Sequence, residues 1–484
     1  MTNTEQKVYG NLINGEWVVS QGSQPIEVRS PVDGSLVGLL SSMSQQELDQ
    51  AVAAAKGARK AWAACPVYQK AQYMYRAADL LEQRAEEIAE CLVMEIAKDR
   101  KSAVSEVKRS ADLLRYTADV GKSLHGETIS GDSFPGGSRG KMSFVTRVPV
   151  GTVLAISPFN YPVNLAISKI GPALMGGNTV ILKPATQGAV SALKMVEAMQ
   201  DAGLPAGVLN TVTGLGSVIG DSIVTHKDVD FINFTGSTEV GQHISALTAM
   251  TPVIMELGGK DAAIVLEDAD LDFAADNIVD GAYSYSGQRC TAVKRILVLE
   301  QVADALVEKL KVRIERLKTG DPREAGVTVT PLVSTKSADF VENLMKDALA
   351  KGAVLVTGGT RQGNLLAPTL LDHVTTGMDV AWVEPFGPVL PIIRVSSQQE
   401  AVEIANRSEY GLQSSVFTNN LNKAYSIAAQ LEVGTVQINN KPERGPDNFP
   451  FLGVKSSGMG TQGVRYSIEA MTRPKAVTIN LTEE

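Results

Sequence analysis

The stretch from 153 to 183, VLAISPFNYPVNLAISKIGPALMGGNTVILK, decides the fold class. Its two ends, VLAIS (153–157) and TVILK (179–183), are short apolar runs that predict buried strands. A helical stretch lies between them. A strand, a helix and a second strand in this order form a βαβ unit, whose strands lie parallel in one sheet. The stretch therefore favours an α/β protein.

The same alternation continues towards the C-terminus. Further strands are predicted at VLNTV (208–212), VDFINF (229–234) and VIMEL (253–257), and a second series at AAIVL (262–266), RILVL (295–299), AVLVT (353–357), VLPIIRV (389–395) and TVQIN (435–439). Two consecutive series predict two open parallel-sheet α/β domains with a cleft between them.

The flanking regions have other patterns. Residues 45–115 predict helices, with an apolar stripe at Met74, Ala77, Leu81, Ala85, Ile88 and Leu92. The Gly/Ser-rich stretch 126–140 predicts an exposed loop. KMSFVTRV (141–148) and KAVTINL (475–481) read as half-buried strands that belong to neither series, and so predict a separate small sheet.

Composition excludes several classes of protein. The chain has 484 residues, 44% of them hydrophobic, which suits a globular protein of several domains. A net charge of −8 argues against nonspecific binding to nucleic acid. The first ten residues lack the apolar core of a signal peptide, and proline, asparagine and Lys169 interrupt the most apolar stretch, 152–174, so no membrane span is expected. Three cysteines, Cys65, Cys91 and Cys290, are too few for a disulfide framework, and we expect a cytoplasmic protein.

Two glycine-rich turns follow predicted strands. GSTEVG (236–241) comes before a helical stretch, where Gly236 and Ser237 could let a phosphate approach the helix N-terminus. GLGSVIG (214–220), which contains Gly216, is one residue too long for the dinucleotide motif. Either turn could instead be purely structural.

Three further residues are candidates for chemistry. Lys183 ends a strand and could hold a ribose hydroxyl or a phosphate, or could simply be solvated. Glu256, on an apolar strand, could be a general base or could form an ion pair with Lys260. Cys290 lies among small and polar residues, so we expect an accessible thiol that Arg289 could shift towards the thiolate, although a lone cysteine is commonly a buried apolar residue.

Other motifs carry no function. GGSRG (136–140) matches the hydrolase pattern G-x-S-x-G but lacks the flanking strand and helix. The four histidines have no metal-ligand spacing, so no metal is expected.

Taken together, the motifs resemble the aldehyde dehydrogenase superfamily. The matching strings are ISPFNYP (156–162), LKPAT (182–186), NFTGSTEVG (233–241), MELGGKD (255–261), GQRCTA (287–292), EPFGP (384–388) and NFPFLGVKSSGMG (448–460). They span nearly the whole chain in the family's order.

The resemblance implies the catalytic roles. Cys290 would attack the aldehyde carbonyl to give a thiohemiacetal. Asn160 would donate a hydrogen bond to the oxyanion, together with the backbone N–H of Cys290. Glu256 would activate the water that hydrolyses the thioester formed after hydride transfer.

The resemblance also implies a nicotinamide cofactor. Lys183 would contact the adenosine ribose, Ser237 the pyrophosphate and Glu384 the nicotinamide-side ribose. NAD-preferring members often carry glutamate where this chain has Thr186. Because a carboxylate would repel a 2′-phosphate, we expect NADP.

A narrower resemblance concerns the substrate. Arg109, Tyr161, Arg289 and Arg444 are similar to the phosphate-binding positions of the non-phosphorylating glyceraldehyde-3-phosphate dehydrogenases. Guanidinium groups and a phenol suit a phosphate dianion. The implied reaction is irreversible oxidation of D-glyceraldehyde 3-phosphate to 3-phosphoglycerate without inorganic phosphate. The alternatives are another anionic aldehyde, such as succinic semialdehyde, or a catalytically silent relative.

The family's organisation implies the domain boundaries. The cofactor-binding domain would be Rossmann-like and comprise 1–122 and 149–256, and the catalytic domain would comprise 257–451. Segments 123–148 and 468–484 would form an oligomerisation element, so a homodimer, or a homotetramer built as a dimer of dimers, is expected.

Overall fold

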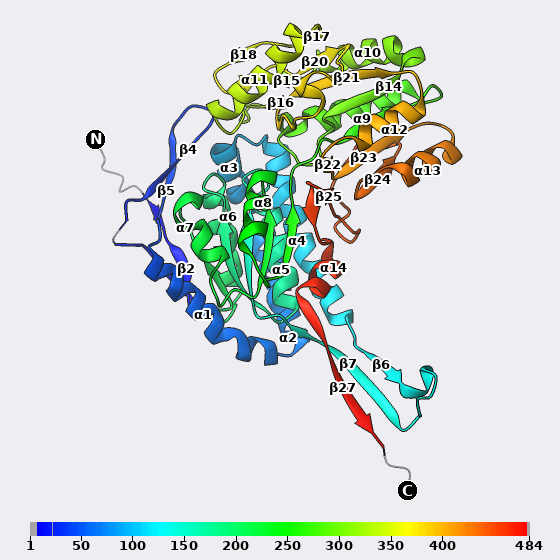
Figure 1. The fold of residues 1–484 in the computed structure, drawn as a ribbon. Coiled ribbons are helices and arrows are strands. Elements are labelled where there is room, and N and C mark those ends of the chain that lie inside the picture. The colour runs from blue at the N-terminus through cyan, green and yellow to red at the C-terminus, as the bar shows by residue number, and fades with distance from the viewer. Residues whose placement is uncertain (1–6, 22, 482–484) are drawn as a thin grey trace, which may run out of the picture.

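Two α/β units and a projecting arm make up the protein in the computed structural model, which describes residues 7–21 and 23–481 (Figure 1). The ends of the predicted domain ranges, 1–6 and 482–484, lie outside the described residues.

The first unit is built on a six-stranded sheet with the order β10-β9-β8-β11-β12-β26. Its strands are β8 (Thr152–Ser157), β9 (Thr179–Pro184), β10 (Leu209–Thr211), β11 (Phe231–Thr235), β12 (Val253–Glu256) and β26 (Gly458–Met459). All neighbouring pairs are parallel except β12 with β26, so the predicted parallel sheet is confirmed.

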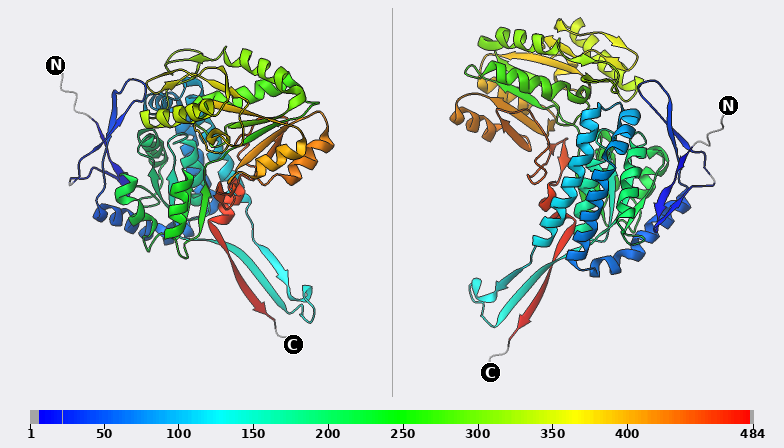
Figure 2. Two further views of the ribbon diagram at one scale, coloured as in Figure 1. Left: turned by 45° about the horizontal axis from the view of Figure 1, so that its top comes forward. Right: turned by 180° about the vertical axis from the view of Figure 1, so that it is seen from behind.

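Helices cover both faces of this sheet (Figure 2). They are α1 (Gln45–Ala64), α2 (Val67–Gln83), α3 (Ala85–Ile96), α4 (Arg100–Ser123), α5 (Asn164–Met175), α6 (Ala189–Asp201), α7 (Gly216–Val224) and α8 (Thr238–Leu247). Successive side chains of a strand point to opposite faces. Val153 and Ala155 of β8 accordingly pack with α2 to α6, whereas Leu154 packs with α1, α7 and α8. The predicted apolar stripe is buried, but it runs over two helices that meet at Arg84.

Short strands form further small sheets beside the two main sheets. β1 (Val8–Tyr9), β5 (Leu36–Leu40) and β4 (Ile26–Arg29) form one sheet. The two-stranded pairs are β2 (Asn11–Ile13) with β3 (Glu16–Val18), β15 (Lys318–Thr319) with β16 (Val327–Val329), β18 (Arg361–Gln362) with β19 (Leu365–Leu366), and β22 (Tyr410–Gly411) with β25 (Val454–Lys455).

The second unit has a seven-stranded sheet with the order β17-β20-β21-β14-β13-β23-β24. Its strands are β13 (Ala262–Val265), β14 (Arg295–Leu299), β17 (Val354–Thr357), β20 (Thr369–Asp372), β21 (Val389–Val395), β23 (Gln413–Phe417) and β24 (Thr435–Ile438). One face packs with α9 (Leu271–Tyr283) and α10 (Glu300–Ile314), and the other with α11 (Thr335–Ala350), α12 (Gln398–Asn406) and α13 (Leu421–Gln430).

One strand of the second series differs from its prediction. β17 was expected to be a buried parallel strand, but it pairs antiparallel with β20 at the sheet edge, and Val354 and Leu355 are exposed. An edge strand is covered on one side only, so an apolar sequence alone does not place a strand in the centre of a sheet.

The arm is the separate small sheet that the sequence predicted. β7 (Lys141–Pro149) pairs antiparallel with β27 (Thr472–Asn480), which follows α14 (Val464–Ala470), and also with β6 (Glu127–Ser130). The expected loop at 126–140 is therefore partly wrong, because β6 occupies its start; the side chains of β27 are also more exposed than expected.

The strand order positions the site. In the first sheet β9 and β10 lie on one side of β8, and β11 and β12 lie on the other. The chain therefore leaves β8 and β11 in opposite directions across the sheet. Open α/β sheets bind ligands at the carboxyl ends of their strands, at such a reversal.

Candidate active site

A cavity of about 430 Å³ opens at these carboxyl ends. Its lining includes residues that directly follow or end four strands of the first sheet: Asn160 after β8, Lys183 at the end of β9, Gly236 and Ser237 after β11, and Leu257 after β12. Cys290, Glu384 and Phe386 come from the second unit and close the other side. The cavity therefore lies between the two units, as the two series of strands predicted.

Cys290 and Glu256 meet across the boundary between the units. Glu256 ends β12, whereas Cys290 lies in the turn between α9 and β14. The thiol Sγ lies 3.3 Å from Oε1 of Glu256 and donates a hydrogen bond to it. A carboxylate next to a half-buried thiol suits nucleophilic chemistry followed by proton abstraction from water.

Glu256 is held as an anion although only 1% of it is exposed. Burial raises the pKa of its carboxyl, but the charges of Arg444 and Lys169 and the hydrogen bonds from Cys290 and Arg444 outweigh burial and keep this pKa below its usual range. The predicted alternative, an ion pair with Lys260, is wrong: the partner is Arg444.

The pKa of Cys290 shifts in the opposite direction. Burial raises the pKa of the thiol well above its usual value, and the negative charge of Glu256 raises it further. The expectation that Arg289 favours the thiolate is wrong, because its guanidinium donates instead to the carbonyl of Gly281. The cations that lower the pKa of Cys290 are Lys294 and Arg444.

Asn160 lies in the loop between β8 and α5 and lines the cavity. Nδ2 donates to the carbonyl of Gln288, 2.9 Å away, which leaves its second N–H for an oxyanion. A buried ion pair fixes this loop: Lys98 binds Glu106 and also donates to the carbonyl of Asn160. Glu106 in turn accepts from the backbone N–H groups at the start of α5.

The predicted cofactor residues separate into two groups. Lys183, Gly236, Ser237 and Glu384 line the cavity, whereas Thr186 and Gly216 do not. Ser237 caps α8, so the positive end of this helix faces the cavity. Burial lowers the pKa of Lys183, and no acidic side chain contributes to the shift.

A second cavity, of about 130 Å³, adjoins Cys290 and Glu256. Its lining contains Arg109, Tyr161, Arg289 and Arg444, the residues expected to hold a phosphate, which are up to 335 positions apart in the chain. Arg109 forms an ion pair with Asp447, 2.9 Å away, and donates to the carbonyl of Arg444. The structure thus brings the four residues together beside the thiol.

Sequence reasoning did not find several residues that shape the site: Lys98, Glu106, Lys169, Lys294 and Gln462. Lys294 donates to the carbonyl of Cys290 and forms an ion pair with Glu384, 2.8 Å away. Lys169 could have been found from the sequence, because it is a charged residue in an apolar stretch. The same argument identified Glu256. Burial lowers the pKa of Lys169 to about 7. Gln462 gave no signal, since glutamine is common on surfaces.

The family follows from comparison with known proteins. The model of the aldehyde dehydrogenase family matches residues 17–477, and the chain belongs to this family. A protein of Streptococcus equinus named NADP-dependent glyceraldehyde-3-phosphate dehydrogenase is 57% identical over 99% of this chain and 100% of its own length. The enzyme of the same name from Pisum sativum is 50% identical over 98% of this chain and 96% of its own.

A solved structure is similar throughout. The crystal structure of NADP-dependent glyceraldehyde-3-phosphate dehydrogenase from Bacillus halodurans C-125, complexed with NADP, has a TM-score of 0.97 and 53% identity. It covers 99% of this chain and 100% of that one. The resemblance and the fold class that the motifs implied are thereby confirmed.

The described residues include neither a membrane-spanning helix nor a metal-binding cluster. Within residues 7–21 and 23–481, no helix is long and apolar enough to cross a membrane. The same part of the chain holds no group of three or more His, Cys, Asp or Glu side chains that could bind a metal ion.

Proposed function

We propose that this protein oxidises D-glyceraldehyde 3-phosphate irreversibly to 3-phosphoglycerate, with NADP as the hydride acceptor and without inorganic phosphate. The observation that carries the proposal is the small cavity in which three arginines and a tyrosine surround Cys290 and Glu256. Relatives at 50% and 57% identity that are named for this substrate and for NADP support it.

The residues of the site divide the chemistry between them. The Cys290 thiol loses its proton to solvent and its sulfur bonds to the aldehyde carbon, so that the carbonyl oxygen becomes an alkoxide that the Asn160 amide stabilises. Loss of hydride from this thiohemiacetal leaves a thioester on Cys290. Glu256 then takes a proton from water, the oxygen of the water bonds to the acyl carbon, and the carbon–sulfur bond breaks to release the acid.

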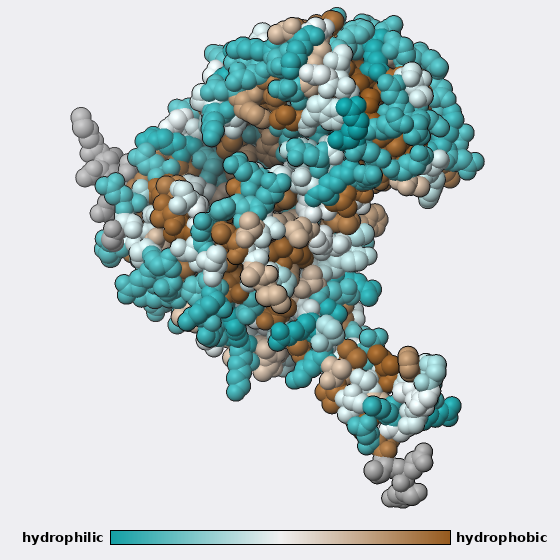
Figure 3. All heavy atoms as spheres, in the orientation of Figure 1, coloured by the Kyte–Doolittle hydropathy of each residue, from teal (hydrophilic) through white to brown (hydrophobic). Residues whose placement is uncertain are grey.

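The large cavity fits a dinucleotide. Lys183, buried and without an acidic partner among the described residues, suits a ribose hydroxyl or a phosphate, and the N-terminus of α8 at Ser237 suits the pyrophosphate. Leu215, Val218 and Val240, at α7 and α8, are exposed. Figure 3 shows apolar atoms, in brown, on this face of the first unit, and a flat base could lie on such a surface. When bound, the nicotinamide supplies the hydride acceptor.

We propose for the other cofactor residues the roles that the family resemblance implies. Glu384 holds the nicotinamide-side ribose from its place beside Lys294. Gly236 lets the pyrophosphate approach the backbone. Thr186 and Gly216 lie outside the lining of the cavity. We still propose both as cofactor-binding residues, with Thr186 leaving room for a 2′-phosphate that a carboxylate would repel.

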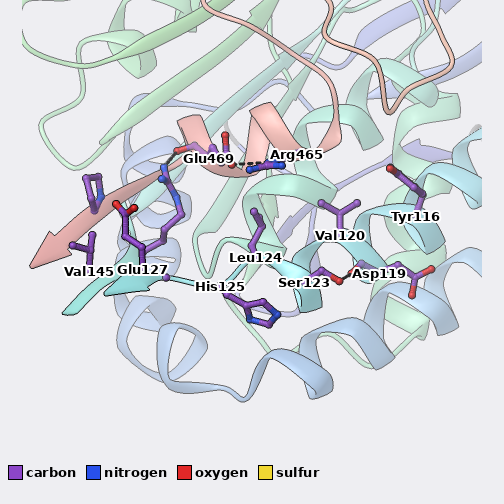
Figure 4. A pocket seen from close by; sticks show the side chains of 13 residues that line it. Tyr116, Asp119, Val120, Ser123, Leu124, His125, Glu127, Val145, Arg465 and Glu469 are labelled. Carbon is purple, nitrogen blue, oxygen red and sulfur yellow. Dashed lines mark hydrogen bonds and ion pairs between the residues drawn. The ribbon is translucent and has the colours of Figure 1, made fainter. Parts of the chain in front are cut away.

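The arm supports a homo-oligomer. β27 is a nine-residue edge strand on which Val477 and Ile479 are exposed, and such an edge associates with another copy of the chain unless something covers it. A hollow of about 720 Å³ at the base of the arm, between the end of α4 and α14, adjoins this edge (Figure 4). We assign both to a subunit interface of a dimer or tetramer. We also propose a cofactor-binding domain of residues 1–122 and 149–256, a catalytic domain of residues 257–451, and an oligomerisation element of residues 123–148 and 468–484.

The initial rate of NADPH formation in phosphate-free buffer tests the function. We expect rapid turnover with D-glyceraldehyde 3-phosphate and NADP, with 3-phosphoglycerate as the product. Succinic semialdehyde is the comparison substrate, because a carboxylate could use the same arginines. Faster turnover of succinic semialdehyde, or a strong preference for NAD, would overturn the corresponding part of the proposal.

A further inference from the structure

The Glu256 carboxylate has little freedom in this structure. Its Oε2 atom accepts hydrogen bonds from the Arg444 guanidinium, from Nε2 of Gln462 at 3.1 Å and from Oγ1 of Thr235 at 3.3 Å. Its Oε1 atom accepts the Cys290 thiol. Every donor stabilises the carboxylate, and so opposes the transfer of a proton to it.

Formation of the thioester relieves only part of this restraint. Acylation removes the thiol hydrogen, so Oε1 loses its donor and can face water. The Arg444 contact at Oε2 is unchanged by that step. Arg444 is the donor with the largest effect, because it carries a full charge, and its pairing with Glu256 is buried, where charges are weakly screened.

Arg444 also belongs to the cavity that would receive the substrate's phosphate. Its Nη1 binds Glu256, while its Nη2 binds Oε1 of Gln462 at 2.9 Å. The ring of Phe451 supports the guanidinium, 5.0 Å away. A phosphate dianion recognises a guanidinium through two parallel hydrogen bonds, and so competes with Glu256 for the same nitrogen atoms.

We propose that the substrate's phosphate releases the base: by taking over the Arg444 guanidinium, the dianion frees Glu256 to accept a proton from the water that hydrolyses the thioester. Arg444 is then a positioning residue for Glu256 as well as a phosphate ligand. This inference rests on the proposed function, since it needs an anionic group in the small cavity. It makes hydrolysis fastest when the correct substrate is bound.

An activated ester tests the inference without cofactor or phosphorylated substrate. The Cys290 thiol displaces p-nitrophenol from p-nitrophenyl acetate, and water then hydrolyses the acetyl thioester. The steady rate after the first burst measures hydrolysis. We expect inorganic phosphite to raise this rate about tenfold or more, the factor that one charge-assisted hydrogen bond represents, whereas chloride at equal ionic strength does not.

Two arginine variants separate the roles. In Arg444→Leu, hydrolysis should no longer respond to phosphite. In Arg109→Leu, which removes a cation that does not contact Glu256, phosphite should still accelerate hydrolysis but at higher concentration. An Arg444→Leu protein that responds to phosphite like the wild type would contradict the inference.

The pH profile of hydrolysis gives an independent readout. The charged groups that face Glu256 are Lys169 from α5 and Arg444, and the titratable thiol of Cys290 faces it as well. Because Arg444 lowers the pKa of Glu256, we expect phosphite, or Arg444→Leu, to move the acid inflection of the profile to higher pH. No effect of phosphite on the rate or profile of the wild type overturns the inference. NADPH formation from D-glyceraldehyde 3-phosphate tests the proposed function separately.

Discussion

Replacing Glu256 by glutamine should separate the two halves of the reaction. The change preserves the size of the side chain, and its amide oxygen can still accept hydrogen bonds from two of the donors now at Oε2, Arg444, Gln462 and Thr235. An amide, however, cannot take a proton from water. A positioned general base contributes about 10²–10⁴-fold, or roughly 3–5 kcal/mol of the barrier. Steady-state turnover of Glu256→Gln should fall by this factor.

The first turnover should survive. Rapid mixing with NADP and D-glyceraldehyde 3-phosphate should produce a burst of one NADPH per site, because nucleophilic attack and hydride loss precede hydrolysis. The burst should slow by about tenfold at most, since the variant weakens one hydrogen bond of the Cys290 thiol, and loss of the Glu256 charge lowers the pKa of the thiol rather than raising it. Cys290→Ser should give no burst. If the burst in Glu256→Gln falls as far as the steady state does, Glu256 acts before hydrolysis and the assignment is wrong.

Three further outcomes are expected. Asn160→Ala should lower kcat/KM by about 10²–10³-fold with cofactor binding retained, as measured by NADPH fluorescence titration; an unchanged kcat/KM would remove Asn160 from the oxyanion site. Because the pKa of Cys290 is raised, the rate at which iodoacetamide alkylates the cofactor-free protein should be low at neutral pH and should still increase above pH ~9. In Glu256→Gln, which lacks the nearby negative charge, this increase should move to lower pH. The same pH profile in both proteins would contradict the coupling between Glu256 and Cys290. Lys98→Met, which leaves Glu106 buried without its cation, should lower the free energy of unfolding by about 3–5 kcal/mol in urea denaturation, whereas a loss below about 1 kcal/mol would show that the pair is not needed for stability.

The sequence was most informative where a strand is apolar. β8, β9 and β14 lie where apolar runs predicted them. β23, which lies inside the second sheet between β13 and the edge strand β24, was missed because its sequence, QSSVF, begins with three polar residues. These are buried all the same, with Ser415 fully inaccessible. Only the neighbouring strands, which are distant in the sequence, determine that burial.

The candidate site shows the same limit. Motifs located Cys290 and Glu256, but their electrostatic environment depends on contacts between distant segments. Proximity in sequence suggested Arg289 as the cation near the thiol, yet a residue next in the chain can point away, as Arg289 does towards Gly281. The contact between Arg444 and Glu256 joins residues 188 positions apart. No local pattern predicts such a pairing.

The contact between Cys290 and Glu256 has a consequence for recombining related enzymes. The nucleophile belongs to one unit and the base to the other, and their separation of 3.3 Å is set by how the units pack. The small cavity is shared in the same way, since Arg109 lies on α4 and Arg444 lies between β24 and β25. A chimera that joins the first unit of one relative to the second unit of another must match both walls of this cleft. Both walls of the cleft must therefore come from the same parent enzyme, even where the rest of each unit is exchanged.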